Sequence, residues 1–133
     1  MKEYAVEKGG KVDLQKLRAS PAPKEMYAQA HQYLPIACHD VFIEYRGGIL
    51  LMVRDNHPAK ELLWMIGGRI LRGISILDSL KKKVKEECGL DIDEIIELGI
   101  GRTLFKTDPF GHGRGTDTVN VVYFARGSGK MKL

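Results

Sequence analysis

Several features are scarce or missing in this 133-residue sequence, and each excludes a class of protein. No run approaches the ~20 apolar residues that a membrane-spanning helix needs, and the first residues, MKEYAVEKGG, lack the apolar core of a signal peptide. The two cysteines, Cys38 and Cys88, do not have the spacing of metal ligands. We therefore expect a soluble, cytoplasmic protein with reduced thiols and no membrane partner.

Internal repeats, interdomain linkers and a strong charge of either sign are also missing. A chain of this length fits one domain, and its 44% apolar and 29% charged residues are typical of globular proteins. The net charge of +4 is spread along the chain, without a basic block interleaved with aromatic residues. This pattern does not favour a nucleic-acid surface, and the same net charge fits a preference for small anionic molecules.

What the sequence does contain is one strong helix pattern. Ser75 has the position of an N-cap and Gly89 that of a C-terminal stop. Between them apolar residues recur at helical spacing, at Ile76, Leu77, Leu80, Val84 and Cys88. The pattern predicts a helix over 76–88 that carries two carboxylates, Glu86 and Glu87, beside its apolar stripe. A short apolar strand that ends in the glycine pair 67–68 precedes it.

The rest of the chain predicts further strands and one shorter helix. We expect a helix over 24–34 that packs Met26, Ala30 and Tyr33. Strands are expected over 36–45, 49–55, 94–105 and 116–126, and a Gly-Gly turn joins the first two. Strands around one strong helix indicate an α/β (α+β) domain with a mixed sheet. This domain would span 35–133, after an N-terminal extension over 1–34 in which a short helix stops before Pro21.

Two histidine-containing stretches complete the candidates. His39 and Asp40 fall in the first strand, where we expect them to satisfy each other or the backbone, without a chemical role. The loop KTDPFGHGRG, over 106–115, holds His112 and Arg114 between glycines. Loops of this kind are where sites keep mobile reacting groups.

The glycine pair and the helix together resemble the Nudix box, Gly-x5-Glu-x7-Arg-Glu-U-x-Glu-Glu-x-Gly-U, where U is aliphatic. The positions that match are Gly68, Val84, Glu86, Glu87, Gly89 and Leu90. Three positions differ, since Ile74 stands for Glu, Lys82 for Arg and Lys83 for Glu. The resemblance spans roughly residues 35–126, and it implies a mixed sheet between helices with the box helix on one face.

The three differences change the charge of the box. Ile74 removes one negative charge and Lys83 exchanges a negative for a positive one, so the box is three charges more positive than the family pattern. Affinity for a divalent ion should fall, because Mg²⁺ is bound through carboxylates and substrate phosphates. Lys83 and Glu87 are also four residues apart, a spacing at which an ammonium and a carboxylate on one helix can pair.

A narrower resemblance is to the GDP-mannose mannosyl hydrolase branch of that family. The run LLMVRDNHPAKELLWMIGGR carries its Arg-x-Asn-x-Pro-Ala pattern before the Trp and an Arg directly after Gly-Gly. TDTVNVVYFA is similar to that branch's following strand, although Asn120 stands where the branch tends to carry a His. The branch hydrolyses the C–O bond of the sugar rather than a P–O bond.

These resemblances imply a site made of three sets of residues around Mg²⁺ or Mn²⁺. The metal ligands would be Gly68, Glu86 and Glu87. The substrate-binding residues would be Arg54, Arg69 and Arg114, whose planar forks suit phosphate oxygens. The catalytic residues would be Glu86, Glu87 and His112, the last as a candidate general base.

Two functions of different classes stay open. The first is a Nudix hydrolase, either a pyrophosphohydrolase or a nucleotide-sugar hydrolase, that needs a divalent metal and acts on a nucleoside diphosphate linked to another group. The second is a binding or sensor module of the same fold, which Ile74 and Lys83 favour. In a purely structural reading, the two glutamates pair with Lys82 and Lys83, and His112 is a surface histidine.

The last stretch of the sequence bears on assembly. Seven residues follow Arg126, where the resembled family adds a further strand and helix. We expect either an open sheet edge that favours a homodimer or a sequence that continues beyond Leu133.

Overall fold

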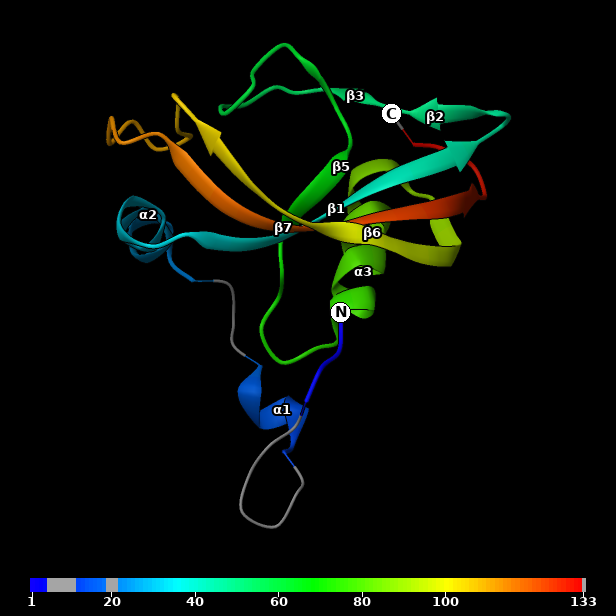
Figure 1. Ribbon diagram of the computed structural model, residues 1–133, viewed down its shortest axis with the longest axis horizontal. Coiled ribbons are helices and arrows are strands. Elements are labelled where there is room, and N and C mark those ends of the chain that lie inside the picture. The colour runs from blue at the N-terminus through cyan, green and yellow to red at the C-terminus, as the bar shows by residue number, and fades with distance from the viewer. Residues whose placement is uncertain (5–11, 19–21, 133) are drawn as a thin grey trace.

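The protein is built on one mixed sheet with a long helix against one face (Figure 1). The structure, a computed structural model, describes residues 1–4, 12–18 and 22–132. Its helices are α1 (Leu14–Leu17), α2 (Lys24–Tyr33) and α3 (Ile76–Cys88). Pro21 and Leu133, on which two of the sequence predictions depend, lie outside the described residues. None of the described helices is long and apolar enough to cross a membrane.

Five strands form the main sheet, in the order β2-β1-β7-β6, and β5 also pairs with β1. β1 and β7 run parallel, whereas the other pairs are antiparallel, so the predicted mixed sheet is confirmed. A second, two-stranded sheet joins β3 to β4. The strands are β1 (Ile36–Tyr45), β2 (Gly48–Leu50), β3 (Met52–Val53), β4 (Leu63–Trp64), β5 (Ile66–Arg69), β6 (Asp91–Phe105) and β7 (Thr116–Ser128).

The two central strands divide the molecule into a core face and an opposite face. Alternate side chains of a strand point to opposite faces, and here the odd-numbered ones join the core. The core on that face contains Val41, Ile43, Val121, Tyr123 and Ala125 together with the stripe of α3. The even-numbered side chains of β1 and β7 therefore line the other face, where Asp40 and Asn120 lie.

Helix α3 forms where the sequence predicts it. The Ser75 hydroxyl accepts a hydrogen bond from the Asp78 N–H at 3.1 Å, and Gly89 ends the helix with φ of 76°. A left-handed residue at this position costs little only for glycine. Ile76, Leu80, Val84 and Cys88 are buried as expected. Leu77 is not, at 38% exposed, and Ser79 takes the remaining buried position.

Three local predictions are wrong in detail. Met26 and Tyr33 of α2 are exposed, and Tyr27 and His31 face inward instead. The second strand of the hairpin stops at Leu50, and β3 pairs with β4 rather than with β1. The apolar strand that precedes α3 runs through its glycine pair and does not stop there, because β5 pairs with β1 along residues 66–69.

Candidate functional site

A cavity of about 490 Å³ opens on the face of the sheet that carries Asp40 and Asn120. Its floor comes from β1 and β7, and its sides from α2, from the loop 54–58 and from β5. Lys83 and Glu87 of α3 also line it, although α3 packs on the other face. They reach it across β5, which carries no side chain at Gly67 and Gly68. The size is that of pockets that enclose small-molecule ligands.

One wall of the cavity is the main chain of β5 at Gly67 and Gly68, and Gly67 shows why this wall cannot carry side chains. A Cβ placed on Gly67 would lie 1.9 Å from Asp40 Oδ1 and 2.7 Å from the His39 carbonyl oxygen. A Cβ on Gly68 would lie 3.0 Å from Cε of Lys83, the far part of a flexible side chain. The strand therefore leaves room for a buried carboxylate on one side and for the lysine on the other.

Two arginines predicted to bind substrate both line the cavity. Arg54 follows β3, and its Nε donates to the Pro58 carbonyl at 2.7 Å, which fixes the guanidinium relative to the loop 54–58. Arg69 ends β5, and its guanidinium carbon lies 3.9 Å from the centre of the Tyr27 ring. Stacking on an aromatic ring holds an arginine in place and leaves its edge for hydrogen bonds.

A third cation enters the cavity from the box helix. Nζ of Lys83 lies 2.7 Å from Oε1 of Glu87, so the ion pair expected from their spacing is confirmed. The lysine stem lies over Gly68, as the contact with its Cβ position shows. Lys83 and Glu87 are both partly exposed, with side chains 33% and 40% accessible.

Asp40, for which the sequence predicts no chemical role, lines the cavity. Its Oδ2 accepts from Asn120 Nδ2 at 2.6 Å, and Asn120 Oδ1 accepts from the hydroxyls of Thr118 and Thr103. Burial raises the pKa of Asp40, although the bond from Asn120 and the charge of Arg54 act against this. A carboxyl group with a raised pKa in a cavity is a candidate for proton transfer.

Of the two kinds of partner expected for His39 and Asp40, each other or the backbone, the first is wrong. His39 faces α3, where its Nε2 lies 2.7 Å from the Ser79 hydroxyl, while Asp40 faces the cavity. Strand alternation, read from the sequence, could have shown that adjacent residues point to opposite faces.

The remaining cavity groups are an aromatic pair and a thiol. Trp64 and Phe105 lie with ring centres 5.7 Å apart at the cavity wall. Cys38 is buried, and burial next to Asp40 raises the pKa of its thiol to about 12, so it is a neutral thiol at pH 7. Both cysteines are free, as expected.

Comparison with solved structures decides the fold. A MutT Nudix hydrolase from Burkholderia pseudomallei superposes with a TM-score of 0.61, at 21% identity over 74% of this chain and 73% of that one. This protein has the Nudix fold. The Nudix domain of NrtR from Shewanella oneidensis, solved with ADP ribose, superposes with a TM-score of 0.55, at 17% identity over 84% of this chain and 76% of that one.

Sequence comparison adds one relative outside the solved structures. No protein-family model matches the chain. The low-salt glycan biosynthesis protein Agl8 of Haloferax volcanii is 30% identical over 74 residues, which make up 56% of this chain and 47% of that protein. The chain therefore spans about half the length of the curated relative it matches.

The residues of this Nudix fold do not fit the divalent cation that its box pattern implies. Of the three expected ligands, Gly68 and Glu87 line the cavity, whereas Glu86 is exposed and does not. Glu87 is already paired with Lys83. Among residues 1–4, 12–18 and 22–132, no group of three or more His, Cys, Asp or Glu side chains could hold a metal ion. An octahedral Mg²⁺ needs several oxygen ligands, and a neighbouring ammonium repels the ion and competes for those oxygens.

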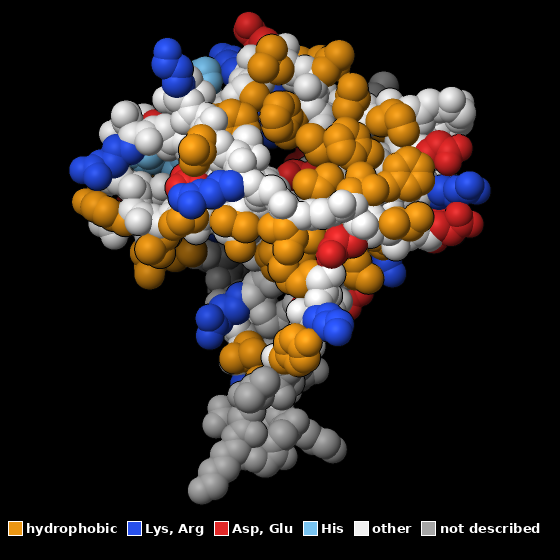
Figure 2. Space-filling model, in the orientation of Figure 1, with side chains coloured by type: hydrophobic (Ala, Val, Ile, Leu, Met, Phe, Trp, Pro, Cys, Tyr) orange, Lys and Arg blue, Asp and Glu red, His pale blue; other side chains and the backbone are white. Residues whose placement is uncertain are grey.

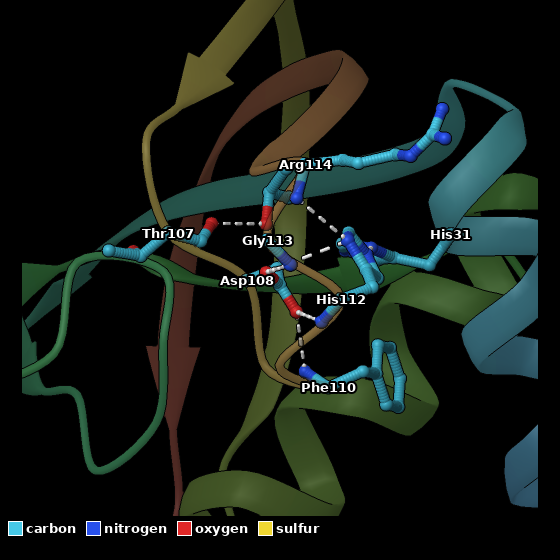
Figure 3. A network of polar contacts seen from close by, with 8 residues as sticks. His31, Thr107, Asp108, Phe110, His112, Gly113 and Arg114 are labelled. Atoms are coloured by element: carbon cyan, nitrogen blue, oxygen red, sulfur yellow. Dashed lines mark hydrogen bonds and ion pairs between the residues drawn. The ribbon is translucent and has the colours of Figure 1, made fainter.

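The loop 106–115 has its own polar network (Figure 3). Asp108 accepts backbone N–H bonds from Phe110 at 2.9 Å, His112 at 3.1 Å and Gly113 at 3.1 Å. Burial acts to raise the pKa of Asp108, but these backbone bonds together hold it below its usual value. The carboxylate is thus the centre around which the loop folds.

Both nitrogens of His112 are used within this network. Nδ1 accepts from the Arg114 N–H at 3.1 Å, and Nε2 lies 2.9 Å from Nδ1 of His31 (Figure 3). Burial, and then the neighbouring His112, lower the pKa of His31, which keeps this ring neutral at pH 7. His112 is not among the residues that line the cavity.

Arg114 points away from the cavity as well. Its guanidinium carbon lies 5.5 Å from the centre of the Tyr33 ring, beside a smaller hollow of about 170 Å³. The structure therefore brings together Arg54, Arg69, Gly68 and Glu87 of the predicted site. It leaves Glu86, His112 and Arg114 outside the cavity.

Proposed function

We propose that this protein hydrolyses a nucleoside diphosphate linked to another group, with nucleotide sugars as the favoured substrates. The observation that carries the proposal is the meeting of three cations, Arg54, Arg69 and Lys83, in one ligand-sized cavity. Each can donate charge-assisted hydrogen bonds to phosphate oxygens, and the two arginines can do so bidentately.

The rest of the cavity suits the other parts of such a substrate. The faces of Trp64 and Phe105 offer an apolar surface for a planar base. Asp40, Asn120 and Thr118 offer hydrogen-bonding groups for hydroxyls. The ADP ribose in the NrtR Nudix domain is a nucleoside diphosphate linked to a sugar, and the name of Agl8 refers to glycan biosynthesis. Both support this substrate class.

In the proposed reaction the cations stabilise the diphosphate as it leaves, and a cavity carboxylate takes the proton of the attacking water. Asp40 suits the second role, because its raised pKa makes it a stronger base than an exposed aspartate. The water oxygen bonds to the sugar carbon, the bond from that carbon to the diphosphate oxygen breaks, and the nucleoside diphosphate leaves. His112 is not carried into this proposal, because its nitrogens are already engaged.

A panel of nucleotide sugars and dinucleotides, assayed with Mg²⁺ and separately with EDTA, tests the activity. We expect turnover of at least one nucleotide sugar, and a loss of about 10²-fold or more in Asp40→Asn. Asp117→Asn is the matched control, because Asp117 pairs with Arg102 and does not line the cavity. Absence of turnover on every substrate would refute the hydrolase.

The second candidate is a module that binds a nucleotide without cleaving it. The ion pair between Lys83 and Glu87 favours it, because that glutamate is the one box carboxylate in the cavity. The two functions separate in a thermal-shift assay followed by product analysis. Stabilisation by a nucleotide that is recovered intact, at every metal concentration, would identify the binding module.

We also propose that the protein forms a homodimer through β6. This edge strand carries apolar side chains that are 57–71% exposed, at Ile96, Leu98, Ile100 and Leu104. Figure 2 shows hydrophobic side chains gathered across the middle of the view, where β6 runs in Figure 1. Light scattering should give twice the mass of the chain for the wild type and the single mass for Ile100→Lys. A monomeric wild type would contradict this.

A further inference from the structure

Helix α3, which carries the box residues, places the Lys83 ammonium where the box pattern implies a bound divalent metal ion. We propose that the Lys83 ammonium takes the place of the divalent cation, so that this protein binds the diphosphate of its ligand without metal. The inference rests on the proposed function, because it concerns the same ligand in the same cavity.

The position of Lys83 is the first support. Its stem lies over Gly68, and its Nζ is 2.7 Å from Glu87. Gly68 and Glu87 are the two members of the expected metal set that reach the cavity. The ammonium therefore occupies the space between the backbone and the carboxylate that a cation would share.

The charge balance is the second support. Glu87 is the one box carboxylate in the cavity, and Lys83 already neutralises it. A divalent ion at this point would lie beside an ammonium, and Glu87, the box carboxylate there, is already neutralised by that ammonium. A diphosphate, in contrast, would be attracted by Arg54, Arg69 and Lys83. The lining also holds two further carboxylates, Asp40, which accepts from Asn120, and Asp55.

The pair also holds the lysine in place. One of the three N–H groups of the ammonium donates to Glu87, which leaves two to donate to phosphate oxygens in the cavity. Glu87 thus acts as a positioning residue. Because the ion pair already restricts the Lys83 side chain, binding of the ligand costs less conformational entropy than it would for a free lysine.

The experiment is calorimetric titration of the full chain with ADP, GDP and ADP ribose, in EDTA and separately in MgCl₂. We expect dissociation constants that agree within about twofold between the two buffers. In Lys83→Gln the affinity in EDTA should fall about tenfold or more, because a charge-assisted bond is lost. Lys83→Arg should keep most of the EDTA-resistant affinity.

Two further variants sharpen the test. Lys83→Glu restores the residue of the box pattern, and we expect its affinity to be higher in MgCl₂ than in EDTA. Lys82→Gln is the control, because Lys82 is exposed and does not line the cavity, and it should bind as the wild type does. Circular dichroism melting curves check that each variant is folded.

The outcomes separate the two proposals. Wild-type affinity that rises tenfold or more with Mg²⁺, or equal affinities for the wild type and Lys83→Gln, would overturn the role of Lys83 and leave the proposed ligand class standing. Absence of binding by every diphosphate in both buffers would overturn the ligand class, and the role of Lys83 with it.

Discussion

The cavity and the loop 106–115 hold similar side chains, but Arg69 and Lys83 of the cavity are less engaged within the chain than Asp108 and His112 of the loop. In the loop, Asp108 accepts three backbone N–H groups and His112 uses both ring nitrogens within the network. In the cavity, Arg69 and Lys83 line open space, and each is held by one neighbour, Tyr27 or Glu87. A histidine or arginine in a glycine-rich loop is therefore a weak sign of a site. What separates Arg114 from Arg69 is that Arg69 lines the cavity and Arg114 does not.

The largest expected effect is on ligand affinity, through one arginine from each region. Arg69→Gln should weaken ADP binding about 10- to 100-fold, since hydrogen bonds to charged groups contribute roughly 1.5–3 kcal/mol. Arg114→Gln should leave the affinity unchanged, because Arg114 stacks near Tyr33 outside the cavity. Calorimetric titration of both variants checks this. Equal losses in the two would remove the distinction between the regions.

The next effect is on stability, through two adjacent cavity glycines. Gly67→Ala should lower the free energy of unfolding by about 1–3 kcal/mol, because its methyl group would overlap Asp40 and the His39 backbone. Gly68→Ala should cost less, because the Lys83 side chain can move away. Urea denaturation of both variants measures the difference. A Gly67→Ala protein as stable as the wild type would contradict the packing of this wall.

The smallest effect is on the pH dependence of stability, and it should have opposite sign in the two regions. The raised pKa of Asp40 means that stability is present below the ordinary aspartate pKa, about 3.9, and is lost as pH rises through the raised value. Asp40→Asn should remove that decline. The lowered pKa of Asp108 means that stability is present above about 3.9 and is lost as pH falls through the lowered value.

Asp108→Asn should therefore be less stable than the wild type at pH 7, and the two should converge in acid. Unfolding free energies measured between about pH 3 and pH 7, on either side of the ordinary aspartate pKa, would show both trends. The quantity compared is the unfolding free energy of the wild type minus that of each variant. If this difference changed with pH in the same direction for both variants, the assignment of the two environments would be contradicted.

The parts of the molecule that were predictable from sequence are those set by local interactions. Ser75 and Gly89 determine the ends of α3 through their own side chain and backbone. The pair of Lys83 and Glu87 follows from their spacing on one helix. The family resemblance selected three residues that line the cavity, Gly68, Arg54 and Arg69. It rests on the box and on the run of sequence directly before it.

The parts that were missed depend on contacts between distant segments. Asp40 reaches Asn120 across 80 residues, in a way that only the register of the parallel pair β1 and β7 fixes. In α2, the inward face is one residue away from the predicted one, because Arg69 and Phe110 pack against Tyr27. No periodicity in the helix itself carries that information.

The glycine pair of β5 has a consequence for how such a cavity can change over evolutionary time. This wall is main chain, whose N–H and C=O groups are the same whatever residues the rest of the chain carries. An exchange of a side chain opposite it, such as Lys83, would leave the groups of the wall unaltered. Under the role proposed for Lys83, such an exchange would change the cation that meets the ligand while this surface stays constant.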